Sequence, residues 1–282
     1  MYKGLSPWAI GVKPASVDEA IQAAVIGGFQ GVEVSAHEIA ELMGSFGEEA
    51  VKAKFTSAGV RPAAFGLPVD YRGEAQKWRD GLEALPSLAR AASAIGAVRT
   101  STWIMPCSND LNFDLNRRFH IERFTPIAEI LAEYGCSLGL EFIGPKTLRD
   151  SQRFPFIYTM EAMLDLGAAI GPNVGLLLDC WHWHTSCGTV RQLHNLLPEQ
   201  VVYVHVNDAP AGVQMDAHLD NVRGLPGETG VIDIVGFLRA LDAIGYEGPV
   251  TPEPFVDLSS LASDEARLKL VGDAMDKIFA MR

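Results

Sequence analysis

Short apolar runs alternate with amphipathic segments along the whole chain. Between residues 17 and 25, apolar side chains recur at the three- and four-residue spacing of a helix. Ser16 and Glu19 open this segment and match a capping box, in which both side chains accept hydrogen bonds from free backbone N–H groups. A glycine pair at 27–28 can end the helix, and the apolar run 31–34 then predicts a strand.

Glycines close further helical patterns at nearly regular intervals, and an apolar run follows each of them. The spacing matches a repeating unit of one strand, one helix and two loops, and the last interval leaves room for an additional unit. The two ends of the chain resemble each other, since residues 28–31 lead to Glu33 and residues 245–248 lead to Glu253. The glycines are Gly28, Gly59, Gly96, Gly135, Gly171 and Gly245.

Eight runs are predicted to be strands. Several have no polar alternation until their last residues, as in 174–179 and 201–205, which is typical of parallel strands buried on both faces. Eight βα units without a linker or a composition shift predict an α/β protein, a single-domain (β/α)8 TIM barrel over residues 1–282. A doubly wound open sheet is the alternative, but no Gly-x-Gly-x-x-Gly motif follows a strand. The predicted strands cover residues 5–11, 30–34, 60–66, 98–105, 137–143, 174–180, 201–206 and 249–254.

Composition narrows the classes of partner. With 48% hydrophobic and 21% charged residues, the chain is neither disordered nor collagenous. Its formal charge of −12 disfavours nucleic acid and anionic membrane surfaces. No apolar run approaches the about 20 residues of a membrane-spanning helix, and the N-terminus lacks a signal-peptide pattern. The four cysteines form no Cys-x-x-Cys motif, so we expect a cytoplasmic protein with reduced, mostly buried thiols.

Four predicted strands end in an ionisable residue. In a barrel, the C-terminal ends of the strands converge on one mouth, where like charges repel each other unless a cation holds them. Each residue alone is better explained as a helix cap or a turn residue, but the whole set predicts one divalent metal ion, Mn²⁺, Mg²⁺ or Co²⁺, with Zn²⁺ also compatible. The residues are Glu141, Asp179, His205 and Glu253.

Further residues are candidates for substrate binding. His182 follows Asp179 by three residues, and Arg223 lies in the long connection after the strand at 201–206. Connections of that length are commonly functional. Trp8 and Trp103, near the predicted ends of the first and fourth strands, could form an apolar wall against a sugar face, although core or rim packing explains them equally well.

The remaining histidines are weaker candidates for the functional site. His184 is explained as a solvated loop residue, and His120 and His194 sit in helical stretches, where we expect structural or surface roles. Glu33, at the end of the second strand, is expected at the mouth. No role is assigned to Glu33, His37 or His218.

Several short motifs follow one another in a specific order: Gly28-Phe29-Gln30-Gly31-Val32-Glu33, Leu140-Glu141, Leu178-Asp179 with His182, Val204-His205, Arg223-Gly224-Leu225-Pro226-Gly227 with Val231-Ile232-Asp233, and Pro252-Glu253. This ordered set, which covers nearly the whole chain, resembles the sugar phosphate isomerase/epimerase family of xylose isomerase-like TIM barrels. The resemblance is strongest to the D-tagatose 3-epimerase type.

The resemblance implies a metal-dependent isomerase or epimerase of a ketose or related oxo-sugar or polyol, a small molecule. Glu141, Asp179, His205 and Glu253 would bind one divalent ion, with Mn²⁺ favoured, and His182 and Arg223 would hold substrate oxygens. Glu141 and Glu253 match two glutamates that lie on opposite faces of the sugar and exchange a proton through a metal-stabilised cis-enediolate. The assembly is left open, including a homo-oligomer.

Two departures from the family pattern point to an atypical substrate. The stretch 227–232 is about one residue longer than the usual family spacing, and the run Trp181-His182-Trp183-His184 is unusual. No cluster of lysine and arginine marks a phosphate clamp at the mouth, so the substrate need not be phosphorylated.

Three other functions remain open at this point. The same residues could expel a β-leaving group, which would make the protein a lyase or dehydratase similar to 3-dehydroshikimate dehydratase. An endonuclease IV-like nuclease would need a richer ligand set for three zinc ions, and the negative charge argues against it. A non-catalytic binding subunit is disfavoured because the predicted ligand set is intact.

Overall fold

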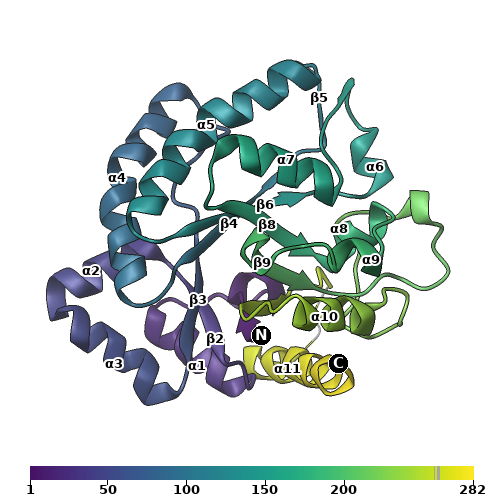
Figure 1. The fold of residues 1–282 in the computed structure, drawn as a ribbon. Helices are drawn as coiled ribbons and strands as arrows, with labels where there is room; N and C mark the ends of the chain where they lie inside the picture. Colours follow the sequence, from purple (N-terminus) through teal and green to yellow (C-terminus); the bar gives the residue numbers. More distant parts are fainter. Residues whose placement is uncertain (257, 259–260) are drawn as a thin grey trace.

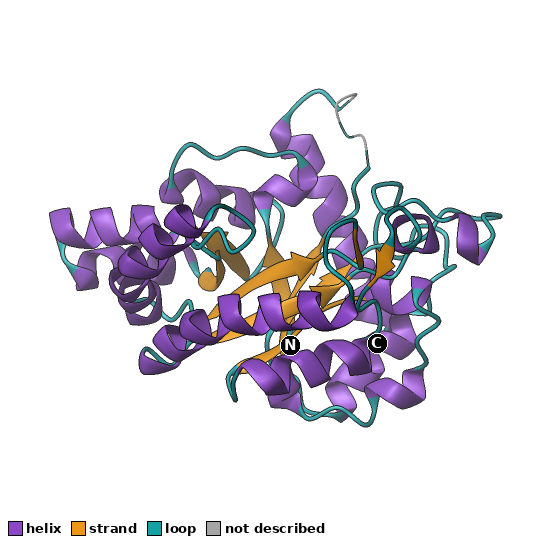
Figure 2. Cartoon of the chain, turned by 90° about the horizontal axis from the view of Figure 1, so that it is seen from above, coloured by secondary structure: helices purple, strands orange, loops and turns teal. Residues whose placement is uncertain are grey.

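The computed structural model describes residues 1–256, 258 and 261–282. Eight parallel strands close into a barrel in the order β1-β10-β9-β8-β6-β4-β3-β2, which confirms the predicted fold. Figure 2 shows these strands at the centre of the molecule, with helices outside them. The barrel strands are β1 (Tyr2–Leu5), β2 (Gly31–Val34), β3 (Arg61–Gly66), β4 (Arg99–Ile104), β6 (Ser137–Phe142), β8 (Val174–Asp179), β9 (Val201–Val206) and β10 (Pro249–Pro252).

Longer helices cover the outside of the barrel, and shorter ones lie in the connections. The N-terminal strand β1 pairs with β10 and α1 contacts α11, so the two ends of the chain lie close together (Figure 1). The longer helices are α1 (Val17–Ile26), α2 (Ala36–Phe46), α3 (Glu48–Ala58), α4 (Ala75–Ala94), α5 (Phe113–Glu133), α7 (Met160–Ile170), α10 (Ile234–Ala243) and α11 (Asp264–Met281). The shorter elements are α6 (Lys146–Arg149), α8 (Cys180–Thr185), α9 (Val190–Leu193), the 3₁₀ turns η1 (Pro7–Ile10), η2 (Pro198–Gln200) and η3 (Met215–Ala217), and the strand pair β5 (Cys107–Ser108) and β7 (Phe154–Pro155).

The start of α1 shows how local sequence sets an element. The Ser16 hydroxyl accepts the N–H of Glu19 at 3.2 Å, as the capping box predicts. The Glu19 carboxylate, however, accepts the N–H of Ala15 at 2.7 Å, one residue before the cap. The prediction was therefore right for Ser16 and one residue off for Glu19. Gly28 follows with φ of 66°, a left-handed conformation that suits glycine after a helix.

The first predicted strand was wrong in its bounds. The sequence predicted residues 5–11, whereas β1 is Tyr2–Leu5 and Pro7–Ile10 form η1. Pro7 has no N–H to give to a sheet, and its fixed φ suits the first position of a helix. The consequence is that Trp8 lies on a turn above the barrel rather than on a strand. The other seven predicted strands overlap the observed ones.

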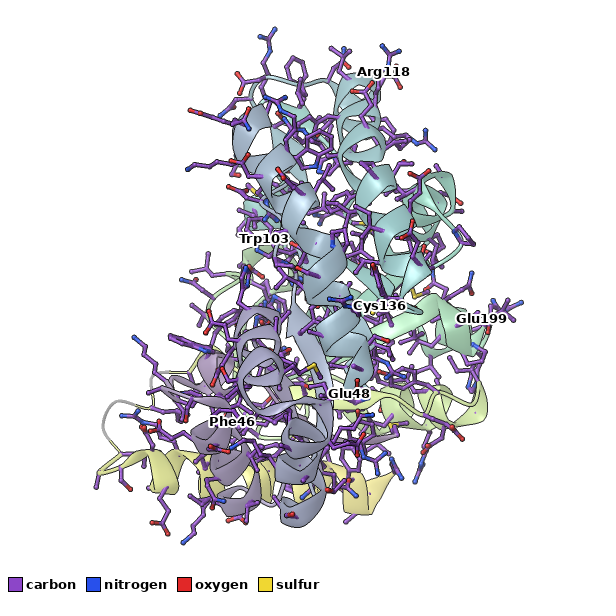
Figure 3. All side chains as sticks on the ribbon, turned by 90° about the vertical axis from the view of Figure 1, so that its left-hand side faces the viewer. Phe46, Glu48, Trp103, Arg118, Cys136 and Glu199 are labelled. Carbon is purple, nitrogen blue, oxygen red and sulfur yellow. The ribbon has the colours of Figure 1, made fainter. Side chains whose placement is uncertain are left out.

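Parallel strands give the barrel two distinct rims. Cys136 immediately precedes β6 and marks the rim where strands begin, whereas Trp103 lies near the end of β4. Figure 3 shows these two residues on opposite sides of the α4 helix in that view. The C-terminal rim is the one where the predicted site residues lie.

The structure adds two facts about the chain as a whole. No helix in the described residues is long and apolar enough to cross a membrane. Three of the four cysteines, Cys107, Cys136 and Cys180, are buried, Cys187 is exposed, and none forms a disulfide within the described residues.

Candidate metal centre

The four predicted ligands meet at the C-terminal rim. Glu141 lies near the end of β6, Asp179 is the last residue of β8, His205 is paired with Asp179 in β9, and Glu253 directly follows β10. One ligand atom from each residue lies within 4.8 Å of all the others. We call this group the cage. The structure thus brings together residues that are up to 112 positions apart (141 to 253) because neighbouring strands end at the same rim.

The cage contains buried atoms without partners. Glu141 Oε1 and His205 Nδ1 are buried and form no hydrogen bond with the described residues. His205 Nδ1 lies 3.4 Å from Glu253 Oε2 and 3.8 Å from Glu141 Oε1. An orphaned buried polar atom is costly, and a cation between these atoms would satisfy both. Three carboxylates and one imidazole are a donor set that suits Mn²⁺, Mg²⁺, Co²⁺ or Zn²⁺, so the residues fit one divalent ion.

Arg223 reaches into the cage from the long connection after β9. Its Nη1 donates to Asp179 Oδ2 at 2.7 Å and to Glu253 Oε2 at 3.0 Å. Its Nη2 donates to Asp220 Oδ1 at 3.1 Å. The guanidinium also lies over the rings of Trp181 and Phe255, with its central carbon 5.4 Å and 4.5 Å from their centres. This buried cation offsets part of the negative charge of the cage.

Two further residues hold Asp179, and the sequence analysis missed one of them. Asp179 Oδ1 accepts the N–H of Trp181 at 2.8 Å, which caps α8, and Asn207 Nδ2 at 3.0 Å. Asn207 also donates to the carbonyl oxygen of Glu253 at 3.3 Å. The available signal was its position two residues after His205 at the end of β9. Asp220, which supports Arg223, carried no comparable signal because it lies within a loop.

The surroundings of the cage shift the pKa values of its two glutamates in opposite directions. Burial, and then the charge of Glu253, raises the pKa of Glu141 well above its ordinary value. Burial alone would also raise the pKa of Glu253, but His205 and Arg223 beside it lower that pKa. Burial disfavours the charged form of His205, yet the neighbouring carboxylates raise its pKa above the ordinary value. The two glutamates, although equivalent in chemistry, therefore differ in proton affinity.

His182 faces the cage and has a donor beside each ring nitrogen. Its Nδ1 accepts the N–H of Gly144 at 3.2 Å, and its Nε2 lies 3.4 Å from Arg223 Nη2. Burial lowers the pKa of His182 to about 3, which keeps the ring neutral. Nε2 lies 3.8 Å from Glu141 Oε1 and 3.8 Å from Asp220 Oδ1. The Nε2 edge of the ring therefore faces the cage, next to the Arg223 guanidinium.

The two candidate tryptophans differ in their surroundings. Trp8 is 65% exposed and lines a cavity of about 440 Å³ at the ends of β1, β2 and β3. Trp103 is 44% exposed and does not line that cavity. The Arg72 guanidinium covers the Trp103 ring at 3.9 Å from its centre. Trp8 therefore lines this cavity and Trp103 does not, and none of the four cage residues is part of the cavity lining.

The other histidines fall into two groups. His120 is buried and His194 is exposed, in line with structural and surface roles. The prediction for His184 was wrong, because it lies on α8 with its Nε2 buried and unpartnered within the described residues. His184 packs against His218, at 5.9 Å between ring centres, and His218 packs against Trp181 at 5.2 Å. A short helix after Asp179 replaces the loop that the run of aromatic residues suggested.

A family model and two solved structures match this chain. Residues 21–278 match the family model described as xylose isomerase-like TIM barrel. The solved structure of a xylose isomerase domain protein from Alicyclobacillus acidocaldarius superposes with a TM-score of 0.85 at 31% identity, over 100% of this chain and 99% of that chain. The IolI protein, solved with a zinc atom, shares the fold with a TM-score of 0.77 at 17% identity, over 99% of this chain and 98% of that chain.

Curated relatives include two kinds of enzyme. An inosose isomerase of Bacillus velezensis is 24% identical over 206 residues, which is 71% of this chain and 69% of the relative. Across three inosose isomerases, the match spans between 51% and 69% of the relative's length. A 3-dehydroshikimate dehydratase of Pseudomonas aeruginosa is 37% identical over 87 residues, which is 30% of this chain and 13% of the relative.

Proposed function

The chain belongs to the xylose isomerase-like TIM barrel family, and from this premise we propose that it is a divalent-metal-dependent isomerase or epimerase of a ketose or related oxo-polyol. The observation that carries the proposal is the cage, in which two glutamates flank His205 with unpartnered buried atoms between them. Its substrate would be a small sugar or polyol, and we propose a cytoplasmic location with Mn²⁺ as the favoured ion. The inosose isomerases among its relatives support this assignment.

The residues of the cage supply the proton chemistry. Glu141 and Glu253 come from β6 and from the residue after β10, so they approach a bound substrate from different directions. One carboxylate removes the proton from the carbon next to the carbonyl, and the electron pair moves onto the carbonyl oxygen. The other carboxylic acid then returns a proton to that carbon from the opposite face. The chemistry that a bound divalent ion supplies is Lewis-acid stabilisation of the negative charge on the substrate oxygens.

Two cationic or donor groups orient the substrate in this proposal. Arg223 is always charged and supports the developing oxyanion, and His182, whose Nε2 lies beside Arg223, contacts a hydroxyl or carbonyl oxygen. Asp179 and Asn207 keep the cage rigid, since the Asp179 carboxylate is engaged on both oxygens. Trp8 is proposed to line the substrate cavity, and Trp103 is proposed to contact substrate only at the outer rim.

A dehydratase is the second candidate, and the match to 3-dehydroshikimate dehydratase favours it. After the same proton abstraction, the electron pair would expel a hydroxyl group from the neighbouring carbon. The residues of the cage serve either outcome. Product analysis separates the two, because elimination leaves a conjugated product that absorbs in the ultraviolet.

The test uses the protein loaded with Mn²⁺ in deuterated water, with inosose and ketohexoses as substrates. We expect deuterium at the carbon next to the carbonyl, loss of exchange on chelation and recovery with Mn²⁺. Glu141→Gln and Glu253→Gln should each abolish exchange, while Glu247→Gln, an exposed glutamate near β10, should not. Full activity in both cage variants would refute the proposal.

A further inference from the structure

The Arg223 guanidinium contacts three carboxylates at the mouth of the barrel and leaves a fourth free. Its Nη1 donates to Asp179 Oδ2 and Glu253 Oε2, and its Nη2 donates to Asp220 Oδ1 at 3.1 Å. The fourth carboxylate is Glu141, whose buried Oε1 has no hydrogen-bond partner among the described residues. Arg223 therefore offsets the charge of the other three by direct contact and leaves Glu141 Oε1 unoccupied.

Glu141 is nevertheless within reach of the same guanidinium. His182 Nε2 lies 3.4 Å from Arg223 Nη2 and 3.8 Å from Glu141 Oε1, so both atoms lie next to one ring nitrogen. A turn of the guanidinium would bring Nη2 toward Oε1, where a charge-assisted hydrogen bond can form. Such a contact would satisfy the buried oxygen but would also occupy it. Some other contact must therefore hold Nη2 where it is.

Asp220 provides that contact. Its carboxylate accepts Nη2, and its backbone carbonyl oxygen accepts Nε at 2.7 Å, so this one residue contacts two of the three nitrogens of the Arg223 guanidinium. The Asp220 side chain is 32% exposed, whereas that of Glu141 is 7% exposed. Asp220 therefore holds Nη2 toward the solvent side of the site, away from the more deeply buried Glu141.

The backbone on both sides of Asp220 is itself anchored. Two residues earlier, the carbonyl oxygen of the buried His218 accepts the Thr147 hydroxyl at 2.6 Å. Four residues later, Gly224 exchanges two backbone hydrogen bonds with Asp208, at 2.7 and 3.0 Å. These contacts restrict where the Asp220 carboxylate can lie, as a residue that positions another side chain requires.

We infer that Asp220 is a positioning residue: it holds the Arg223 guanidinium away from Glu141, so that Glu141 Oε1 stays free to bind the metal ion and to exchange a proton with substrate. The inference rests on the proposed function, in which Glu141 acts within the cage. Asp220 acts through Arg223 and needs no contact with substrate. Removing its carboxylate should let Arg223 turn inward and occupy Glu141 Oε1.

The first test measures Mn²⁺ binding by calorimetry, without substrate. Asp220→Ala should raise the Kd for Mn²⁺ by about tenfold, the scale of loss when a residue that supports a metal ligand is removed. Asp220→Asn keeps an acceptor for Nη2 and should recover part of the affinity. Asp216→Ala, at an exposed position of the same connection, should match the wild type. An unchanged Kd in Asp220→Ala would overturn the inference.

The Arg223→Met background decides whether Asp220 acts through Arg223. Without the guanidinium, nothing turns toward Glu141, so adding Asp220→Ala to Arg223→Met should change the Kd for Mn²⁺ by less than about threefold. An equal loss of affinity in both backgrounds would show that Asp220 attracts the ion by its charge alone, and the inference would then be wrong.

A metal-free measurement separates this inference from the proposed function. In urea unfolding with chelator, Glu141→Gln should raise the unfolding equilibrium constant by at least about fivefold more in Asp220→Ala than in the wild type, because Arg223 then pairs with Glu141. Equal effects in the two proteins would contradict the inference, whatever the protein catalyses. If this difference is present but the wild type binds no Mn²⁺, the proposed function fails while the role of Asp220 in holding Arg223 stands.

Discussion

Replacing Arg223 with methionine tests how charge is balanced in the cage. Arg223 is 5% exposed and pairs with Asp179 at 2.7 Å and with Glu253 at 3.0 Å. Arg223→Met keeps the length of the side chain and leaves both carboxylates without their cation. Removing one partner of a buried ion pair typically costs about 3 to 5 kcal/mol in the free energy of unfolding. The Glu253 side chain retains 18% exposure, so we expect the lower half of that range.

Mn²⁺ should restore much of this loss. A divalent ion held by the cage residues would lie near Arg223, because Arg223 contacts Asp179 and Glu253, and two positive charges that close would repel by a few kcal/mol at an effective dielectric constant of about 20. The ion should therefore bind the variant more tightly than the wild type. We expect the Mn²⁺-induced gain in unfolding free energy to be larger in Arg223→Met by at least about 1 kcal/mol. Activity should be lost all the same, because the oxyanion loses its charged partner.

The assay is urea unfolding of both proteins in chelator and in excess Mn²⁺. Arg90→Met, on the exposed face of α4, is the matched control and should behave as the wild type. Arg223→Lys keeps the positive charge but loses the paired N–H donors of the guanidinium. Its free energy of unfolding in chelator should therefore lie between those of Arg223→Met and the wild type. The reasoning would be refuted if Arg223→Met lost less than about 1 kcal/mol in chelator, or if Mn²⁺ stabilised both proteins equally.

Three further predictions concern residues around the cage and the core. Burial lowers the pKa of His120 from 6.5 to about 4, so the unfolded chain takes up the proton first as the pH falls. His120 should contribute about 3 kcal/mol to the free energy of unfolding above pH 6.5, and this contribution should be lost as the pH falls through about 4. His120→Phe should flatten that part of the profile of unfolding free energy against pH, measured by urea unfolding, and a profile identical to that of the wild type would contradict this. Asn207→Ala removes one of the two hydrogen bonds that Asp179 Oδ1 accepts and should weaken Mn²⁺ binding roughly 10- to 100-fold by calorimetry, and unchanged affinity would remove Asn207 from the site. His218 is the buried residue within the otherwise solvent-accessible stretch 211–222, so His218→Ala should speed cleavage of that stretch in limited proteolysis, while His218→Phe, which keeps the packing on Trp181, should slow it again.

Local patterns predicted most of the elements of the fold. Apolar periodicity and caps such as Ser16 depend on residues a few positions apart, and these interactions persist in the folded chain. The error at residues 5–11 arose because Pro7 lies within an apolar run and redirects the backbone into a turn. The helix that carries His184 depends on Asp179 as its cap, a contact that the aromatic run does not reveal.

The sequence by itself predicted eight buried parallel strands, four of which end in a carboxylate or an imidazole, because strand periodicity and strand ends depend on neighbouring residues. It therefore predicted that Glu141, Asp179, His205 and Glu253 would share a rim, before any distance was known. Only the tertiary structure decided that Arg223 inserts between two of these carboxylates and that Asn207 holds a third oxygen. The physical reason is that loop side chains take positions from packing across the barrel, where contacts join residues far apart in the chain and leave no local pattern.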